Sequence, residues 1–515
     1  MPEYLTPGVY TEEIEIGAKP IEGISTSTVG FLGPTERGPT NPELVTNFGD
    51  FQNKFGVFVE GSYLAYGVQG FFSNGGQRCF IGRIAGKNAQ NSTNNLTQKE
   101  DDTDRDVVKI TAVGPGEWGN NIAVNVEPAT LFKEGKNQLF KLTLKYWKSM
   151  VTSEEDNLTV DDKINAQENN PADVMEVYDN LSPIAASSDY YEKRINGISN
   201  LVNVEAITEG HLDSQITLLD NGDQGTEIKT ADYRGNEAAP PGERTGLAAF
   251  EEIDNINIVC VPDENSSNLA GLTSDIVGHC EKMKDRFAVL QAKQSAGDVG
   301  KLEPPLDSKY AAFYYPWIKV IDPVTNNKML VPPGGHIAGI YARSDTERGV
   351  HKAPANEVVR GAQELQFNIK KGEQDILNPK GVNCLRVFPG RGIRVWGART
   401  TSTDPLWKYL NVRRLFLYIE GSIEQATQWV VFEPNNERLW ARVKQSITQF
   451  LTTVWRDGAL MGMTPDEAFF VKCDRTTMTQ DDIDNGRLIV MIGIAPVKPA
   501  EFVIFRIAQW TGGSE

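Results

Sequence analysis

Two glycine-rich segments come closest to the spacing of a ligand-binding motif. Gly114, Gly116 and Gly119 have the GxGxxG spacing of a dinucleotide-binding loop, in which a following helix directs its backbone amides at a pyrophosphate. The next residues, NNIAVNVEP, are typical of a strand instead. The segment Gly82–Lys87 is one residue shorter than a phosphate-binding P-loop, and Asn88 stands where a magnesium-binding hydroxyl is needed. We therefore predict no nucleotide site and no cofactor.

Histidines, aspartates and serines form no catalytic or metal-binding pattern either. No histidine pair has the i, i+4 spacing with which two histidines on one helix bind zinc. Asp102–Asp106 resembles the start of a calcium loop, but Val107 occupies the position of the turn glycine. No serine lies in a GxSxG turn. We predict no catalytic residue and no metal site, and we expect packing or surface roles for the four histidines: His211, His279, His336 and His351.

The composition is that of a globular protein with several domains. The chain has 515 residues, of which 40% are hydrophobic and 23% charged, so about two to four domains are expected. A net charge of -18 disfavours binding to phosphate backbones, and no nucleic-acid partner is predicted. The cysteines are odd in number and have no CxxC spacing, which favours a reducing cytosol: Cys79, Cys260, Cys280, Cys384 and Cys473.

Neither a membrane span nor a secretory signal is predicted. The longest apolar run, Leu488–Val497, is far shorter than the ~20 residues that cross a bilayer. The first residues, MPEYLTPGVYTEEIEIG, lack the basic start and apolar centre of a signal peptide. We therefore expect no direct insertion into a membrane.

The first 20 residues are predicted to be an extended arm. Tyr10, Ile14 and Ile16 fall on one face of a period-two pattern, with polar residues on the other face. Prolines at three positions exclude a helix through this stretch: Pro2, Pro7 and Pro20. A strand with one apolar face must pair, either at the edge of its own sheet or elsewhere.

The predicted secondary structure changes along the middle of the chain. Residues 25–90 are predicted to form a compact α/β unit, and strand-like runs separated by polar turns follow up to about residue 237. From residue 245 buried strands alternate with helices, which predicts an open α/β sheet. The expected fold class is therefore mixed α/β (α+β), with several domains.

One long amphipathic helix is predicted in the last third. Asn436 is placed to cap a helix that runs to about Trp455. Its apolar residues recur every three or four positions: Leu439, Val443, Ile447, Phe450 and Val454. The opposite face is neutral to basic, which predicts either a contact surface or a solvated face: Arg438, Arg442, Gln445, Gln449 and Arg456.

Two apolar strands are predicted close to the C-terminus, over 487–495 and 501–510. In the second strand both faces are largely apolar, so it must be covered on both sides. Either it lies centrally in its own fold or a neighbouring copy buries it, because an uncovered strand of this kind promotes aggregation.

Several motifs, taken in order, resemble the contractile tail sheath family of phages, R-type bacteriocins and extracellular injection particles. The resemblance covers roughly residues 1–85 and 240–515. It rests on PGVYTEE (7–13), GFLG (30–33), ERGP (36–39), PPGGHIAG (332–339), YAR (341–343), GVHKAPAN (349–356), FPGRG (388–392), VWGAR (395–399), NVRRL (411–415) and VFEPN (431–435).

The resemblance implies a sheath core built from N- and C-terminal parts of the chain, with an inserted outer domain and extended terminal arms. The expected divisions are an N-terminal arm (1–20), a first core part (21–89), a β-rich insertion (90–237), an α/β sheath domain (238–360), a C-terminal core domain facing the tube (361–497) and a C-terminal strand arm (498–515).

In that family the arms add strands to sheets of neighbouring subunits, and the sheath surrounds an inner tube. The receiving strand is expected at Leu488, Val490 and Ile492, and the tube-facing helix at Arg438, Arg442 and Lys444. The arm residues are expected to be Val9, Tyr10, Thr11, Ile14, Ile16, Phe502, Ile504, Phe505 and Ile507.

The resemblance also implies partners, a location and a non-enzymatic role. The expected partners are further copies of the chain, an inner tube protein, and baseplate and cap or terminator proteins. The particle would be assembled in the bacterial cytoplasm and then released or anchored. Two alternatives stay open: a subtilisin-like hydrolase built on residues 245–350, and another tail component such as a terminator or baseplate protein.

Overall fold

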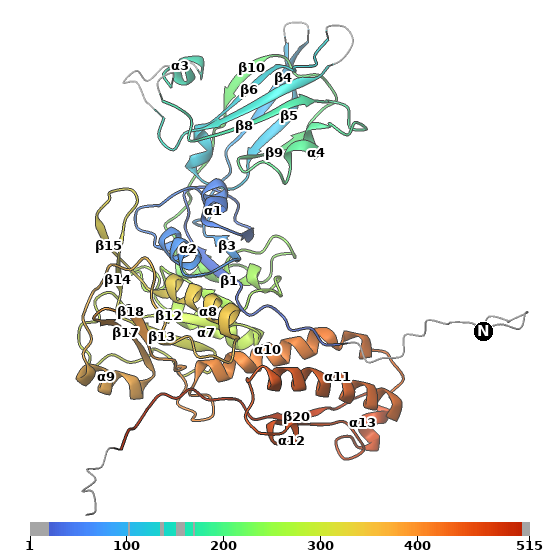
Figure 1. The fold of residues 1–515 in the computed structure, drawn as a ribbon. Helices are drawn as coiled ribbons and strands as arrows, with labels where there is room; N and C mark the ends of the chain where they lie inside the picture. The colour runs from blue at the N-terminus through green and yellow to red at the C-terminus, as the bar shows by residue number, and fades with distance from the viewer. Residues whose placement is uncertain (1–19, 101–102, 134–137, 151–159, 168–169, 507–515) are drawn as a thin grey trace, which may run out of the picture. The chain divides into compact units, whose positions relative to one another are not determined.

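The computed structural model describes residues 20–100, 103–133, 138–150, 160–167 and 170–506 (Figure 1). The chain divides into two compact units. Among the described residues, the sheet unit lies within 25–348 and 353–410, and the C-terminal unit comprises residues 20–24, 349–352 and 411–506. One boundary between these units lies at 410/411, and the six divisions expected from the sequence stay predictions. Among the described residues no helix is both long and apolar enough to cross a membrane.

An eight-stranded sheet organises the sheet unit. Its order is β18-β17-β13-β12-β11-β1-β3-β2, and neighbouring strands are parallel except for the two edge strands β18 and β2. The strands are β1 (Val29–Gly33), β2 (Glu43–Val45), β3 (Cys79–Arg83), β11 (Ile258–Cys260), β12 (Phe287–Gln291), β13 (Ala311–Tyr315), β17 (Val382–Phe388) and β18 (Gly392–Trp396). All residues of β1, β11, β12 and β13 are buried, as expected for a parallel sheet covered on both faces.

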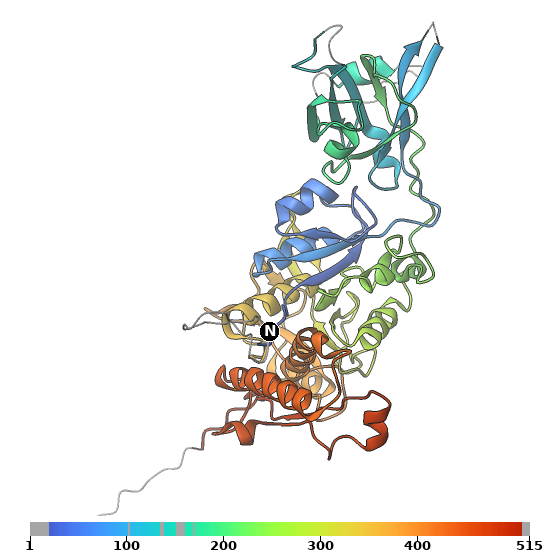
Figure 2. The same ribbon diagram turned by 90° about the vertical axis from the view of Figure 1, so that its right-hand side faces the viewer.

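Helices cover both faces of this sheet (Figure 2). On one face the ring of Phe31 meets that of Phe71 in α2, at a centroid distance of 5.7 Å. On the other face a side chain at Gly30 would collide with Phe250 of α6. Outside residues 90–229, the described helices of this unit are α1 (Phe48–Phe55), α2 (Leu64–Ser73), α5 (Thr230–Arg234), α6 (Gly246–Phe250), α7 (Leu272–Met283), α8 (Gly334–Arg348), α9 (Lys371–Leu377) and the 3-10 turn η2 (Asn378–Lys380). The predicted alternation of strands and helices is confirmed.

Helices α2 and α8 approach so closely that glycine is required between them. A Cβ atom on Gly335 would lie 2.2 Å from the backbone oxygen of Gly67, and one on Gly339 would lie 2.4 Å from that of Phe71. The close packing of α2 and α8 therefore explains the glycines at 335 and 339 of the PPGGHIAG motif. A small sheet of β14 (Ile318–Ile321), β15 (Lys328–Val331) and β16 (Glu364–Leu365) completes the region.

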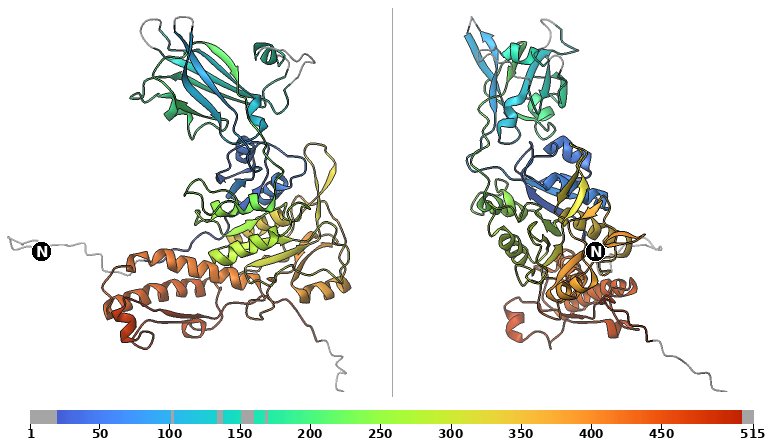
Figure 3. Two further views of the ribbon diagram at one scale, coloured as in Figure 1. Left: turned by 180° about the vertical axis from the view of Figure 1, so that it is seen from behind. Right: turned by 90° about the vertical axis from the view of Figure 1, so that its left-hand side faces the viewer.

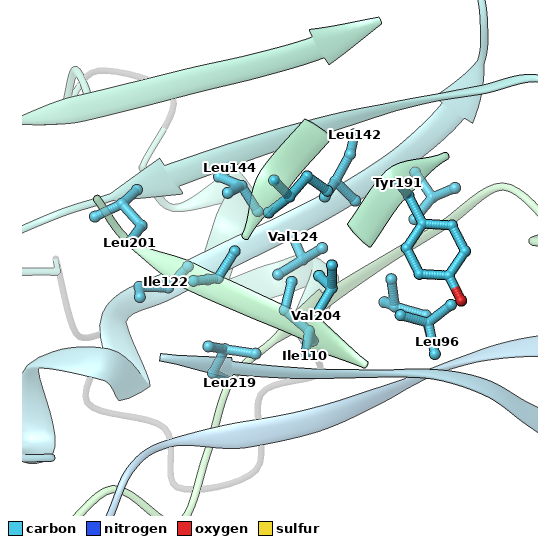
Figure 4. Packing of buried hydrophobic residues seen from close by; sticks show 14 of the residues in the cluster. Leu96, Ile110, Ile122, Val124, Leu142, Leu144, Tyr191, Leu201, Val204 and Leu219 are labelled. Carbon is cyan, nitrogen blue, oxygen red and sulfur yellow. The ribbon is translucent and has the colours of Figure 1, made fainter. Parts of the chain in front are cut away.

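Residues 90–237 form a β-rich segment with its own hydrophobic core (Figure 4). One antiparallel sheet has the order β4-β5-β9 and the other has the order β10-β6-β7-β8. Side chains from both sheets meet in the core, for example Ile110, Val124 and Leu144. The strands are β4 (Thr93–Glu100), β5 (Thr103–Ala112), β6 (Ile122–Pro128), β7 (Phe140–Tyr146), β8 (Val174–Leu181), β9 (Val202–Ala206) and β10 (Gln215–Leu218), with helices η1 (Glu117–Asn121), α3 (Val160–Asn165) and α4 (Tyr191–Ile195).

Two long helices and one strand pair build the C-terminal unit. Helices α10 (Leu410–Ala426) and α11 (Glu437–Arg456) lie side by side (Figure 3), and the ring centroids of Tyr418 and Phe450 are 6.0 Å apart. The antiparallel pair β19 (Phe469–Lys472) and β20 (Met491–Ile494) contributes to the same core as α11. Short helices complete the unit: η3 (Gln428–Val430), α12 (Pro465–Ala468) and α13 (Gln480–Asp484).

Candidate assembly surfaces

Helix α11 begins and packs as its sequence predicts. The Asn436 side-chain oxygen accepts a hydrogen bond from the Leu439 backbone N–H at 3.0 Å, which caps the first turn. The helix continues to Arg456, so the predicted end near Trp455 is confirmed. All five residues of the predicted apolar stripe are buried: Leu439, Val443, Ile447, Phe450 and Val454. The opposite face is left exposed.

The three cations predicted to face a tube do not lie on one side of α11. Each residue turns a helix by about 100°, so Arg438 and Arg442 share one flank, and Lys444 lies on the other flank of the exposed face. The guanidinium of Arg442 lies 4.6 Å from the ring centroid of Trp429, which fixes it against η3. Sequence inspection missed this contact because Trp429 and Arg442 lie on different elements.

Lys444 lines a shallow groove of about 460 Å³ between α11 and residues 473–476. Across the groove Arg475 forms an ion pair with Glu437 at 3.1 Å. Hydrogen bonds from Thr476, aided by Lys472 and Lys444, lower the pKa of the Asp474 carboxyl from its ordinary value. The groove thus offers one lysine ammonium beside an ionised carboxylate, and it is less cationic than the Arg438 and Arg442 flank.

The predicted receiving strand is shorter than expected. Ile492 lies in β20, whereas Leu488 and Val490 precede the strand. All three are partly buried against the core of the C-terminal unit. On the outer face Phe470 of β19 and Met491 of β20 are half-exposed. Among the described residues this sheet has two strands, so each strand retains an edge without a strand neighbour.

The strand predicted over 501–510 is not formed in its described part, 501–506. The reason is physical, because a strand requires a hydrogen-bonding partner and this segment has no strand neighbour there. Phe502, Val503, Ile504 and Phe505 are between 69% and 83% exposed. These four residues therefore do not lie centrally in the fold of the subunit. The other arm residues, Ile507 and Val9, Tyr10, Thr11, Ile14 and Ile16, lie outside the described residues.

The polar side chains at the ends of the parallel strands do not form a hydrolase triad. Asp263 accepts hydrogen bonds from the Ser62 hydroxyl at 3.0 Å and the Tyr63 N–H at 2.7 Å. Burial lowers the pKa of His279 to about 3 and that of His336 to about 4. Among the described residues, neither of these histidines is hydrogen-bonded to a serine or a cysteine. In the part of the chain that the structure describes, no cluster of His, Cys, Asp and Glu is arranged to hold a metal.

Two consecutive segments match domains of a known family. Residues 227–401 match the phage tail sheath protein central domain, and residues 402–509 match the phage tail sheath C-terminal domain. The chain belongs to the contractile tail sheath family. The C-terminal sheath domain contains α11, the strand pair β19–β20 and the exposed segment Phe502–Phe505.

Relatives and solved structures agree with this assignment. Over 332 residues, 59% of the chain, it is 25% identical to the tail sheath protein of Burkholderia phage BcepMu, and the alignment spans 66% of that protein. It is 27% identical over 186 residues, 35% of the chain, to the tail sheath protein of Vibrio phage KVP40, spanning 27% of that protein. The fold resembles that in the PVC sheath complex, an extracellular contractile injection system in its contracted state. There the TM-score is 0.60 and the identity 22%, with 99% of both chains covered.

Proposed function

We propose that this protein is the structural subunit of a contractile sheath. It polymerises helically around an inner tube and contracts by repacking contacts between subunits, which drives the tube through a target envelope. The observation that carries this proposal is the apolar segment Phe502–Phe505, left exposed within a matched sheath domain. No step of the proposed work requires a catalytic residue or a cofactor.

The exposed segment supports an exchange of arms between copies. Phe502 and Ile504 alternate with Val503 and Phe505, so an extended arm would present apolar side chains on both faces. Burial of each such side chain contributes about 1.5–3 kcal/mol. Strand addition would also satisfy the backbone groups of the arm.

The strand pair β19–β20 is the proposed receiver of these arms. A pair of strands is marginal as a sheet, and added strands would extend it. The N-terminal residues Val9, Tyr10, Thr11, Ile14 and Ile16 are proposed as a second arm. Leu488, Val490 and Ile492 already hold their segment against the core, which would keep the receiving edge in place while an arm binds. Exchanged strands would keep subunits connected while the rest of each subunit moves.

Helix α11 is the proposed tube-facing element. Its contact would be electrostatic, from Arg438 and Arg442 on one flank and from Lys444 on the other. Each exposed ion pair contributes only about 0–1 kcal/mol, so a single contact is easily released. Many identical contacts along a polymer hold collectively, and they would separate when the sheath contracts. The further proposed partners are baseplate and cap or terminator proteins, with assembly in the bacterial cytoplasm.

The energy of contraction is proposed to come from surface buried between subunits. At roughly 25 cal/mol per Å² of apolar area, a few hundred Å² gained per subunit would release several kcal/mol. A baseplate trigger would let one ring repack, and successive rings would follow.

Electron microscopy of the purified, concentrated protein tests this function. We expect hollow, striated cylinders, with or without a co-expressed tube protein. Ile504→Asp should abolish them, because a charge would enter the proposed strand addition. Leu406→Asp is the matched control, since Leu406 is also exposed but lies outside the arm. Cylinders formed equally well by Ile504→Asp would contradict arm exchange, and small closed rings from the wild type would favour a terminator or baseplate role.

A further inference from the structure

Phe432 has an unusual backbone conformation and an unusual position. Its φ angle is 68°, in the left-handed region that bulky side chains rarely adopt. The other non-glycine residues with a positive φ in the described chain are asparagines and one lysine. The Phe432 side chain is also fully exposed to solvent. The protein therefore holds a large aromatic ring in water on a strained backbone.

Contacts on both sides fix this residue in place. Before it, the ring of Trp429 lies under the guanidinium of Arg442. After it, the Asn435 side-chain oxygen accepts a hydrogen bond from the indole N–H of Trp440 at 2.7 Å. Phe432 thus projects from a loop anchored twice to the first turns of α11.

Neither the strain nor the exposure stabilises the subunit by itself. A left-handed non-glycine residue costs of order 1–3 kcal/mol, and such strain is concentrated at functional sites. Glycine at this position would relieve it without loss of a contact inside the subunit. An exposed aromatic side chain is a typical anchor for a partner.

A second exposed apolar feature lies at the other end of α11. Met461 and Met463 are 57% and 88% exposed on either side of Gly462. The carbonyl of Gly462 accepts a hydrogen bond from the indole N–H of Trp455 at 3.1 Å, which anchors this loop to the last turn of the helix. The helix rises 1.5 Å per residue, so the anchoring residues Trp440 and Trp455 are about 22 Å apart along its axis.

We infer that Phe432 of one copy packs against Met461 and Met463 of the next copy. This inference rests on the proposed self-assembly and names one of its contacts. The two surfaces lie at opposite ends of one helix, so they cannot meet within a subunit. A contact between unlike ends is heterologous, and repeated copies of it generate a ring or an open helix.

The chemistry of the two surfaces favours a second copy as the occupant. Both are apolar, and methionine sulfur makes favourable contacts with aromatic rings. Methionine is also flexible, so the contact can persist while its geometry changes. Such tolerance suits an interface that is retained between an extended and a contracted polymer.

Engineered cysteines test the contact directly. All five native cysteines are buried, so a bis-maleimide will react chiefly with introduced ones. We expect Phe432→Cys/Met463→Cys protein to give a ladder of covalent multimers on denaturing gels, and a mixture of the two single variants to give dimers only. Phe432→Cys/Leu406→Cys is the control and should give no ladder. Dimers from Phe432→Cys alone would show a symmetric contact and overturn the inference.

A second variant separates this contact from folding and from the proposed function. Phe432→Gly should raise the melting temperature of the subunit or leave it unchanged, and should raise the concentration needed for assembly at least tenfold. If the wild type forms cylinders but the double-cysteine variant gives no ladder, the contact is overturned and the sheath function stands. If the wild type forms no cylinders, that result counts against the sheath function. If the double-cysteine variant also gives no ladder in concentrated solution, the contact is overturned too.

Discussion

The eight-stranded sheet and the C-terminal unit differ in how they cover their apolar residues. Strands β1, β11, β12 and β13 are buried along their whole length by helices of the same chain. The strand pair β19–β20 is covered on one face, and the segment after it presents four exposed apolar side chains in a row. The apolar residues of the first region are covered within the subunit, whereas several of those in the second region are left exposed.

Truncation of a buried ring should show the largest difference between the two regions. Phe31→Ala removes a fully buried side chain and its edge contact with Phe71, so we expect a loss of about 3–5 kcal/mol in the free energy of unfolding. Phe505→Ala is the matched variant in the exposed segment and should change stability by less than about 0.5 kcal/mol. Urea denaturation of the unassembled protein measures both. Equal losses would show that the C-terminal segment is covered within the subunit.

The buried carboxyl of Glu264 makes the stability of the sheet unit depend on pH. Burial raises the pKa of Glu264 to about 8, and its carboxyl oxygen Oε1 accepts a hydrogen bond from the Gln291 backbone N–H. Between pH of about 4.3 and 8 the folded chain keeps a proton that the unfolded chain has released, so stability falls as pH rises.

Glu264→Gln should remove this contribution to the pH dependence of stability, since glutamine carries no charge at any pH. Relative to the variant, the wild type should lose about 1 kcal/mol per pH unit between pH 5 and 7.5 in urea titrations. A pH-independent difference between the two proteins would show that Glu264 titrates normally. Glu433→Gln, at an exposed glutamate of the C-terminal unit, is the control.

Loss of the α11 cap should have an intermediate effect, confined to the C-terminal unit. Asn436→Ala removes the acceptor of the Leu439 N–H, and we expect a loss of about 1 kcal/mol. Gln449→Ala, on the exposed face of the same helix, should be nearly neutral. Hydrogen exchange at the first turn of α11 locates the effect, and slow exchange there in Asn436→Ala would argue against the cap.

The smallest effect on stability is expected from the cations of α11. Arg438→Glu and Lys444→Glu should each change the free energy of unfolding by less than about 0.5 kcal/mol. Their effects on co-sedimentation with a tube protein should differ if only one flank of α11 faces the tube. Equal binding by both variants and the wild type would exclude α11 as the tube contact.

Short-range sequence patterns predicted many of the helices and strands. They did not predict contacts between residues that are distant in the sequence. The Asn436 cap and the apolar stripe of α11 are periodic and short-range, so they could be predicted. The cation–π contact of Arg442 depends on the turn between two helices, which no periodicity encodes. The separation of Lys444 from Arg438 follows from helix geometry and was available from the sequence.

The predicted strands near the C-terminus differ from the structure because strand formation depends on a hydrogen-bonding partner. Both 487–495 and 501–510 are apolar enough for strands, yet only Met491–Ile494 finds a partner among the described residues. Hydrophobicity indicates that a segment will be covered, but not by which chain. In the proposed arm exchange the covering chain is a neighbouring copy, and the sequence of one chain does not identify it.

The strand order has a consequence for how the protein matures. Val29 of β1 pairs with Ile258 of β11, so the centre of the sheet cannot close until half of the chain has been synthesised. The β-rich segment of 90–237 has a core of its own and precedes β11 in the chain. Non-local pairing slows folding, and we expect this segment to become protease-resistant first. In a ribosome-bound intermediate, the segment of 90–237 would then be folded before β1 pairs with β11.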